Sequence, residues 1–323
     1  MKFCSIIIPF KNSKKTINKC LGSALNQQGN VDYEILLVDD FSNDGSSKIV
    51  KKIIKKKNNC KLLRSKIITL GPGHARNLAL KKAKGKYIYF LDSDDILKNN
   101  AIKKLEKEIN KYQNVDLLCN NFQILDKIGN FKKKSRHDLK FYNQSKKKII
   151  KNFFYLSIIP QVISSLIKKD LIKKKKINFY HGYFEDVFFY FRVLFYAKSI
   201  KKVTSKVYIK INRRKSIVNS LTDDHIKNSF RAYYKCYQFL TSGKNIVFGK
   251  KELKFLFMVS IVGQVAVFLK RINFFEKDLK KLKLLLNITR KLYFSYKKKI
   301  NINYKFSSKK DIIAKNFLYS YKD

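Results

Sequence analysis

The stretch YIYFLDSDD, from Tyr87 to Asp95, passes directly from an apolar and aromatic run into three carboxylates. A short apolar run of this kind is typical of a strand that is buried on both faces of a sheet. Carboxylates repel one another, so three of them at one strand end predict a cation or a donor-rich partner there. We therefore interpret Asp92, Asp94 and Asp95 as part of a site for a metal ion and a diphosphate.

Strand and helix signals alternate on both sides of this stretch over the first 120 residues. We expect strands at 3–9, 34–38, within 61–70, in the opening stretch and at 115–119, and helices at 14–27, 46–56, 74–84 and 98–111. Such alternation predicts an α/β fold with a doubly wound, mostly parallel sheet, which binds ligands at the carboxyl ends of its strands. Asp39 and Asp40 follow the second strand, so a second acidic cluster is expected at the same edge.

The rhythm changes after about residue 126. We expect a polar loop at 127–147, a helix at 149–172 interrupted by Pro160, a helix that opens at Glu185 and Asp186, a strand at 200–211, and helices from about 224 onward. The change of rhythm divides the sequence into three regions, at 1–125, 126–222 and 223–323, of which the last is basic and helical.

The chain is strongly basic, with 72 Lys and Arg against 23 Asp and Glu and a net charge of +49. Only nine of the basic residues are arginines, whereas nucleic-acid readers generally use Arg. The charge favours anionic partners, but the sequence lacks an RNP-type motif, a zinc pattern and a basic heptad region, so no nucleic acid is expected as a partner. A nucleic-acid-binding protein remains the alternative from another class.

Two further features bear on the compartment. Five scattered cysteines without a CxxC pair are typical of reduced thiols in a cytosol. The uncharged apolar stretch Phe255–Leu269 is shorter than the roughly 20 residues that span a bilayer, which favours a buried or interfacial helix. We therefore expect a cytoplasmic protein, with peripheral contact at the inner face of the plasma membrane as an open possibility.

Seven of the 23 acidic residues fall into three small clusters, at 39/40, 92/94/95 and 185/186. The clusters belong to a series of motifs, SIIIPFKN, VDDFSNDGS, GHARNLAL, KGKYIYFLDSDD and FEDVFFYFRV, that occur in this order. In order and approximate spacing the series resembles the family-2 inverting glycosyltransferases of the GT-A fold, over roughly residues 3–220. The resemblance is closest to bacterial enzymes that build capsule, lipooligosaccharide or wall polymers.

The resemblance implies transfer of a sugar from a nucleotide diphosphate donor, preferably a UDP-sugar, to a saccharide or lipid-linked acceptor. It implies Mg²⁺ or Mn²⁺ as cofactor, because these ions take carboxylate and diphosphate oxygens. Asp94 matches the metal ligand of the family's D-x-D motif, and Asp92 matches the position near the ribose or the metal. Other positions are matched to the donor: Pro9 and Lys11 line the nucleotide, Asp40 accepts from the base, and Arg76 reaches either the phosphates or the acidic clusters.

Glu185 and Asp186 match the family's E-D pair. Inverting transfer needs a base for the acceptor hydroxyl, and we assign this role to Asp186, with Glu185 orienting the acceptor or supporting the metal. The alternatives are a helix N-cap with a first-turn acid, and His181 as a rival base. His74 is interpreted as structural. A further motif, NRRKSI, resembles the loop that closes over the diphosphate and adds candidate donor contacts at Arg213, Arg214 and Ser216.

Three features remain open at this stage. Asp39 has a structural turn as an equal alternative to a role at the base, and Lys11 stands where many members of the family have Tyr. The basic helices of the last hundred residues either contact an anionic membrane or pack within the protein. An inactive scaffold of the same fold is a further hypothesis, against which the retained D-x-D and E-D pairs argue.

Overall fold

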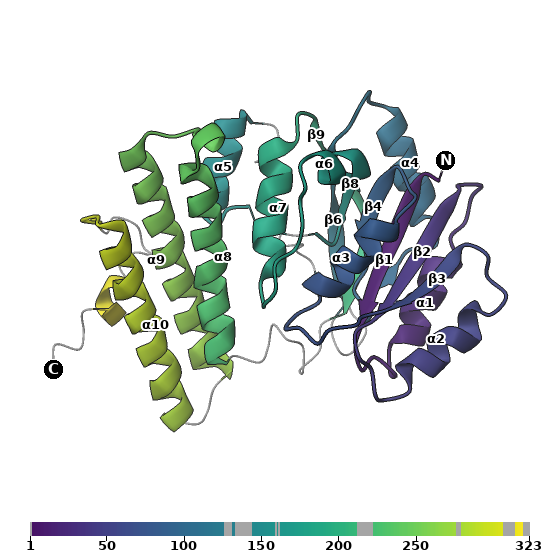
Figure 1. Ribbon diagram of the computed structural model, residues 1–323, viewed down its shortest axis with the longest axis horizontal. Coiled ribbons are helices and arrows are strands. Elements are labelled where there is room, and N and C mark those ends of the chain that lie inside the picture. The colour runs from purple at the N-terminus through teal and green to yellow at the C-terminus, as the bar shows by residue number, and fades with distance from the viewer. Residues whose placement is uncertain are drawn as a thin grey trace. The chain divides into compact units, whose positions relative to one another are not determined.

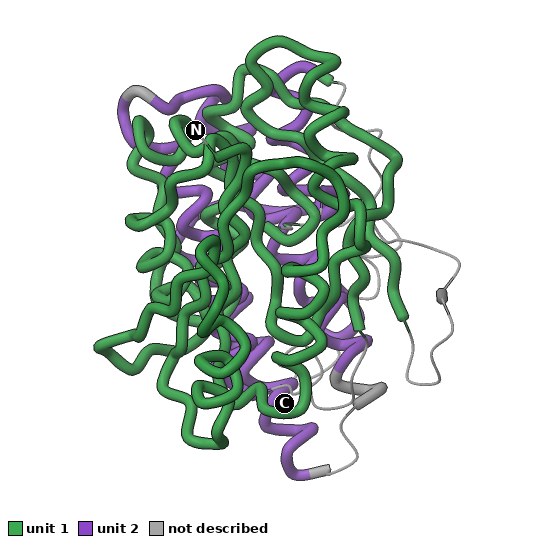
Figure 2. Tube along the Cα trace, turned by 90° about the vertical axis from the view of Figure 1, so that its right-hand side faces the viewer, with its two compact units in different colours: residues 1–144, 160–213 green, residues 145–159, 214–323 purple. Residues whose placement is uncertain are grey.

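A computed structural model describes two compact units, which are coloured separately in Figure 2. The first comprises residues 1–144 and 160–213, and the second comprises residues 145–159 and 214–323. The described residues are 2–125, 131–132, 144–158, 160, 162–211, 222–275, 279–305 and 314–318.

The first unit is built on a nine-stranded sheet with the order β3-β2-β1-β4-β8-β6-β9-β5, in which β7 also pairs with β6. The bounds of its strands are β1 Cys4–Phe10, β2 Tyr33–Asp39, β3 Cys60–Arg64, β4 Tyr87–Phe90, β5 Ile96–Leu97, β6 Leu117–Leu125, β7 Phe131–Lys132, β8 Ser165–Lys168 and β9 Ile200–Ile211. The predicted α/β class is confirmed, and so are the five early strands, within a few residues at each end. The third strand ends at Arg64, and the strand predicted at 115–119 continues to Leu125.

The strands β1, β2, β3 and β4 run parallel, so their carboxyl ends meet at one edge (Figure 1). The first two strands and β4 are buried over their whole length, which explains their unbroken apolar sequences. In this register Phe10 lies beside Asp39, and Asp39 lies beside Arg64. The predicted convergence of the first two acidic clusters at one edge follows from this pairing.

The prediction of a helix over 149–172 is wrong at residues 165–168, whereas residues 169–172 are helical as predicted. Helix α5, Lys146–Phe154, ends before Pro160, and residues 165–168 form β8, which inserts antiparallel between β4 and β6. The strand is buried at Ser165, Leu166 and Ile167 and has apolar neighbours on both sides. The periodicity of so short an apolar run does not distinguish a strand from a helix. These residues form a strand because they pair with β4 and β6.

Six helices complete the first unit over its described residues, and the helices predicted near 14–27, 46–56, 74–84, 98–111 and 185 are confirmed. Their bounds are α1 Ile17–Leu25, α2 Ser46–Ile54, α3 Gly73–Lys82, α4 Ala101–Asn110, α6 Lys169–Lys174 and α7 Glu185–Tyr196. Helix α1 buries Ile17, Cys20, Leu21 and Ala24. Helices α3 and α7 each begin next to the acidic edge of the sheet, which is described below.

The second unit is helical, as predicted for the C-terminal region. It contains α5, α8 Asp223–Thr241, η3 Gly243–Asn245, α9 Lys250–Phe275 and α10 Leu279–Ile300, of which α8, α9 and α10 lie side by side (Figure 1). Within α9, the segment 250–271 is long and apolar enough to cross a membrane, and 61% of its most apolar window is buried in the structure. The core helix of a soluble protein meets the same criterion of length and composition.

Candidate active site

The second strand ends in two buried carboxylates with different surroundings. Asp39 accepts a hydrogen bond from the amide of Ser42 at 2.9 Å through Oδ1, and its Oδ2 lies 3.8 Å from Nε of Arg64. Both contacts stabilise the turn after β2, which agrees with the structural alternative for Asp39. Asp40 is 5% exposed, and its Oδ1 is buried without a hydrogen-bond partner among the described residues.

Burial raises the pKa of Asp40, and the Ser65 hydroxyl and the Lys11 ammonium lower it. A buried carboxylate oxygen without a protein donor can accept a hydrogen bond from a bound ligand, and Oδ2 of Asp39 shares this property. Pro9 is buried in β1, and Lys11 is exposed just beyond the end of that strand. The three residues that were predicted to line the nucleotide therefore occupy the ends of two adjacent strands.

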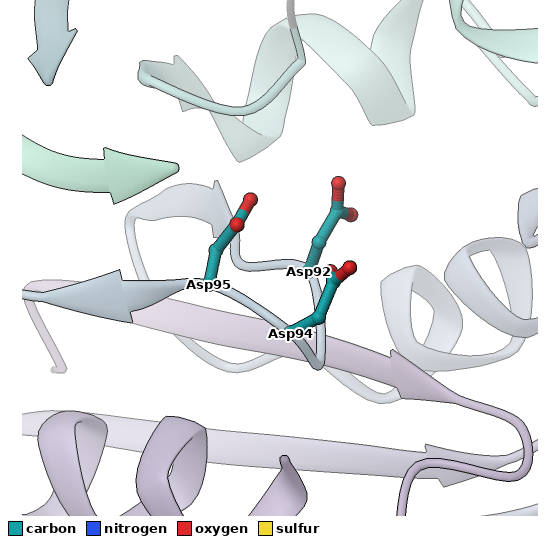
Figure 3. Close-up of side chains that lie close together, drawn as sticks. All are labelled: Asp92, Asp94 and Asp95. Carbon is teal, nitrogen blue, oxygen red and sulfur yellow. The ribbon is translucent and has the colours of Figure 1, made fainter. Parts of the chain in front are cut away.

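The carboxylates of Asp92, Asp94 and Asp95 rise from one turn after β4 and point to the same side (Figure 3). Each can offer one oxygen such that the three oxygens lie within 4.8 Å of one another. Asp95 is buried and accepts hydrogen bonds from the Tyr208 hydroxyl at 2.6 Å and the Ile211 amide at 2.8 Å. It thus ties the turn to β9 and has a structural role within the acidic cluster.

Three residues that sequence reasoning did not single out hold the turn in place. The Ser13 and Ser93 hydroxyls lie 2.8 Å apart, the Cys20 thiol donates to the Asp92 carbonyl at 3.3 Å, and the Asp92 amide donates to the Tyr208 hydroxyl at 3.3 Å. These contacts join the turn to the segment after β1, to α1 and to β9. None has a local sequence signal, because each partner is distant in the chain.

Arg76 is the centre of the site. Its Nη2 donates to Oδ1 of Asp92 at 2.9 Å, and its Nη1 donates to Oε1 of Glu185 at 2.5 Å. The Arg76 and Glu185 side chains are 5% and 6% exposed, so these charges are almost fully withdrawn from water. Of the two roles predicted for Arg76, the structure shows contact with the acidic clusters.

The position of Arg76 follows from the start of α3. Gly73 opens that helix, and a side chain there would come within 2.8 Å of Cγ of Glu185 and 2.9 Å of the Tyr180 carbonyl oxygen. The glycine therefore lets α3 approach the segment before α7 closely. The guanidinium also lies over the Phe179 ring, 5.4 Å from its centroid, so an aromatic face stabilises the buried cation.

Glu185 and Asp186 form the first turn of α7, directly after Phe184 in a left-handed conformation with φ 58°. Burial raises the pKa of Glu185 to about 7 against the lowering effect of Arg76. Burial likewise raises the pKa of Asp186 to about 6, Arg76 lowers it, and Asp92 raises it. A carboxyl group with a pKa near the working pH is suited to accept and release a proton.

The helix-start alternative is correct as a description of where the E-D pair lies, and it does not exclude a chemical role. A capping acid gains little from burial, whereas Glu185 is 5% exposed and shares Arg76 with Asp92. The rings of His74 and His181 stack with centroids 5.8 Å apart, which agrees with a structural role for His74. The candidates Arg213, Arg214 and Ser216 lie outside the described residues.

The arrangement brings two chemical functions to one place. Asp92 and Asp94 offer oxygen ligands of the kind that Mg²⁺ and Mn²⁺ prefer, so the residues present fit a divalent cation. Asp186, whose pKa is raised, is electrostatically coupled to Asp92 and Arg76. Arg76 contacts both the D-x-D pair and the E-D pair and so brings them together. Arg76 and Glu185 are 109 residues apart in the sequence.

Comparison with known proteins agrees with this geometry. A sequence model described as glycosyl transferase family 2 matches residues 5–175, more than half of the chain. The chain belongs to this family. A family member from Staphylococcus aureus (strain N315), the poly(ribitol-phosphate) beta-N-acetylglucosaminyltransferase TarP, is 32% identical over 252 residues, which is 73% of each protein.

A second relative in the family is the cholesterol galactosyltransferase of Borreliella burgdorferi, which is 29% identical over 230 residues. The match covers 68% of this chain and 63% of that protein, so the chain spans less than two thirds of this relative's length. The crystal structure of S. aureus TarS 1–349 shares the fold, with a TM-score of 0.67 at 19% identity over 98% of this chain and 88% of that one. The predicted GT-A fold is thereby confirmed.

Proposed function

We propose that the protein is an inverting glycosyltransferase that moves a sugar from a nucleotide diphosphate donor, preferably a UDP-sugar, to a saccharide or lipid-linked acceptor in surface polysaccharide synthesis. The names of its relatives support this class of reaction, since they include N-acetylglucosaminyl-, galactosyl- and glucosyltransferases. TarS, which has the same fold, has been crystallised with UDP-GlcNAc and with UDP.

One observation carries the proposal: the buried Arg76 binds the buried Glu185 and the half-buried Asp92 at the same time. A buried ion pair is expensive to assemble and is weak support for stability alone. A bridge between two acidic motifs at the carboxyl edge of the sheet is better explained by a site that needs both motifs in fixed positions.

In the proposed mechanism Asp186 accepts the proton of the acceptor hydroxyl as its oxygen attacks the anomeric carbon of the donor. The bond from that carbon to the diphosphate oxygen breaks, and its electron pair leaves with the diphosphate. Glu185 and Arg76 hold Asp186 near the reacting groups. Asp92 and Asp94 would hold a divalent cation, which would neutralise the charge that develops on the leaving diphosphate.

The donor and acceptor are assigned to different parts of the chain. Residues 1–125 bind the nucleotide sugar, with Asp40 accepting a hydrogen bond from the N3–H of uracil and with Pro9 and Lys11 beside the nucleotide. Residues 126–222 bind the acceptor. The unpartnered Oδ1 of Asp40 supports the first assignment, because it is a buried acceptor that lacks a donor.

The test is transfer measured with a panel of nucleotide sugars and a saccharide acceptor, with and without Mg²⁺ or Mn²⁺. Asp94→Ala and Asp186→Asn are each expected to lower turnover by at least about 100-fold, because each removes charge stabilisation or proton transfer from the transition state. Asp32→Asn is the control, since Asp32 is an exposed carboxylate whose side chain is 64% accessible.

Donor binding is measured separately by thermal stabilisation, which requires no turnover. Wild-type turnover that persists in a chelator, or an Asp186→Asn variant with full activity, would contradict the mechanism. A wild-type protein that is stabilised by UDP-sugars but transfers none, with any acceptor tested, would instead indicate the inactive scaffold.

A further inference from the structure

The connection between β3 and α3, residues 65–72, carries three exposed apolar side chains at the edge of the sheet that holds the site. Ile67, Ile68 and Leu70 are 48%, 73% and 51% exposed. Single exposed apolar residues are ordinary on protein surfaces, but three within four positions form a local apolar tip. We call this segment the 65–72 loop.

The exposure of these side chains follows from how the loop is anchored. At one end Ser65 is buried, and its amide donates to the Asp39 carbonyl at 2.9 Å while its hydroxyl donates to the Ile67 carbonyl at 2.9 Å. At the other end the Gly182 amide donates to the Leu70 carbonyl at 3.1 Å. The backbone is thus fixed at both ends, and the apolar side chains project from it.

The loop lies beside the proposed acceptor end of the site. Its contact with Gly182 joins it to the segment that leads into Glu185 and Asp186, and the ring of His74, just after the loop, stacks on His181. The Leu70 end of the tip therefore lies next to the segment that carries the proposed base. This is the place where a lipid-linked acceptor would have to present its sugar.

The exposed charges next to the tip are basic, while Asp39 and Glu185 lie buried at the two ends of the loop. Arg64 and Lys66 flank the tip and are exposed, and the sequence has no acidic residue between Asp44 and Asp92. A few apolar side chains flanked by cations match the interface of an anionic bilayer, where headgroups attract the charges and the apolar groups enter the acyl boundary. A stable protein interface, in contrast, buries about 800 Å² on each partner, far more than one short loop offers.

We propose that the 65–72 loop inserts Ile67, Ile68 and Leu70 into an anionic lipid bilayer and so docks the catalytic edge on the membrane. The biological sense of this contact rests on the proposed transferase activity toward a lipid-linked acceptor. The contact itself requires no turnover and can be measured separately.

The experiment is cosedimentation of the full chain with vesicles of phosphatidylcholine alone and of phosphatidylcholine with phosphatidylglycerol. Wild type is expected to bind the anionic vesicles, more weakly as salt is raised. The double variant Ile67→Ser, Ile68→Ser is expected to bind them about 100-fold more weakly, because the two large apolar side chains no longer leave water. Ile246→Ser is the matched control, since Ile246 is 66% exposed and belongs to the helical unit.

A second control separates the basic helix α10 from the loop. Leu284 is 56% exposed on that helix, and Leu284→Ser is expected to keep the wild-type vesicle affinity. Equal binding by wild type and the loop variant, or a loss seen only with Leu284→Ser or Ile246→Ser, overturns the proposal. Sedimentation without lipid tests a second copy of the chain as the occupant: a loop variant that turns a dimer into a monomer also overturns it.

The result is distinguishable from the proposed activity. Transfer to a soluble saccharide acceptor is expected to be unchanged in the loop variant, because the substituted side chains are exposed and belong to none of the residues of the site. Transfer to an acceptor embedded in vesicles is expected to fall with vesicle binding. Vesicle binding by a wild-type protein that transfers no sugar would support the proposed docking surface and contradict the proposed activity.

Discussion

At Arg76 a single guanidinium faces several carboxylates, and its charge sets how readily they hold protons. Burial raises the pKa of Asp186, and Arg76 is the largest opposing influence. The same cation opposes the effect of burial on Glu185. The arginine therefore keeps the proposed base available near neutral pH while it joins the two acidic motifs.

We predict that the rate of transfer falls as the pH is lowered through about 6, because protonated Asp186 cannot accept the hydroxyl proton. Arg76→Met removes the charge that lowers the pKa of Asp186, so the acidic limb of the pH–rate profile is expected to move to higher pH. Arg76→Lys keeps the charge without the two-pronged contact, so the limb is expected to stay near that of wild type while kcat falls. The measurement is kcat against pH at saturating donor.

The same variants are compared by thermal unfolding. Arg76→Met leaves the buried Glu185 carboxylate and the half-buried Asp92 carboxylate without their cation, a loss expected to cost about 3 kcal/mol, and Arg76→Lys is expected to cost less. A limb that keeps its position in Arg76→Met, in protein shown to be folded, would contradict the assignment of Asp186. A displaced limb in Arg76→Lys would show that hydrogen bonding, not charge, controls the pKa.

Among the elements, the fit of β1 against the start of β4 depends on one glycine. A Cβ on Gly85 would lie 2.4 Å from the backbone carbon of Cys4, and the Gly85 amide donates to the buried Ser5 hydroxyl at 2.9 Å. Ser5 in turn donates to buried Glu34 at 2.6 Å. The contact that clashes is backbone, so it cannot yield as a flexible side chain would.

Gly85→Ala is therefore expected to lower the free energy of unfolding by about 2 kcal/mol or more, because strand β1 must shift. Gly22 is the matched control: it lies inside α1, and a Cβ there would meet nothing within 4 Å. Gly22→Ala is expected to raise stability by about 0.5–1 kcal/mol through helix propensity. Urea unfolding of both variants measures the difference, and equal effects would show that the β1–β4 junction adapts freely.

These elements also show how much of the fold and of the site can be predicted from the sequence. Strands such as β1, β2 and β4 are predictable because burial on both faces leaves unbroken apolar runs, and the acidic clusters at their ends mark the site. Strand β8 was missed because four residues carry too little periodicity, and only pairing with β4 and β6 fixes their state. The contact of Arg76 with Glu185 and that of Tyr208 with Asp95 each join residues more than a hundred positions apart, which no local pattern encodes.

At the scale of the molecule, the chain order and the compact units differ. Helix α5 comes between strands of the sheet in sequence, yet it groups with the C-terminal helices. Within that unit the ring of Phe153 packs 5.5 Å from that of Tyr233, and Lys147 pairs with Glu252 at 3.4 Å. The functional boundaries predicted at 125 and 222 remain predictions, and the second would separate α5 from these partners.

We predict that a chain ended after residue 222 is poorly soluble. It keeps every described strand, but α5 loses α8 and α9, and the apolar face formed by Ile149, Ile150, Phe153 and Phe154 becomes exposed. A contiguous apolar face of this kind favours aggregation. The shortened chain is expected to bind a hydrophobic dye strongly and to elute as aggregate in size-exclusion chromatography, whereas the full chain does neither.

The control is the same shortened chain with Ile149→Ser and Phe153→Ser, which is expected to recover solubility, because the exposed face is then interrupted by hydroxyls. Placing the two substitutions in the full chain is expected to have the opposite effect, lowering its stability by several kcal/mol, because buried side chains are then replaced by smaller polar ones. The two substitutions are thus expected to improve the shortened chain and to harm the full chain. Both effects together require that the helices beyond residue 222 cover α5 in the full chain. A shortened chain that is soluble without the substitutions would show that α5 does not depend on them.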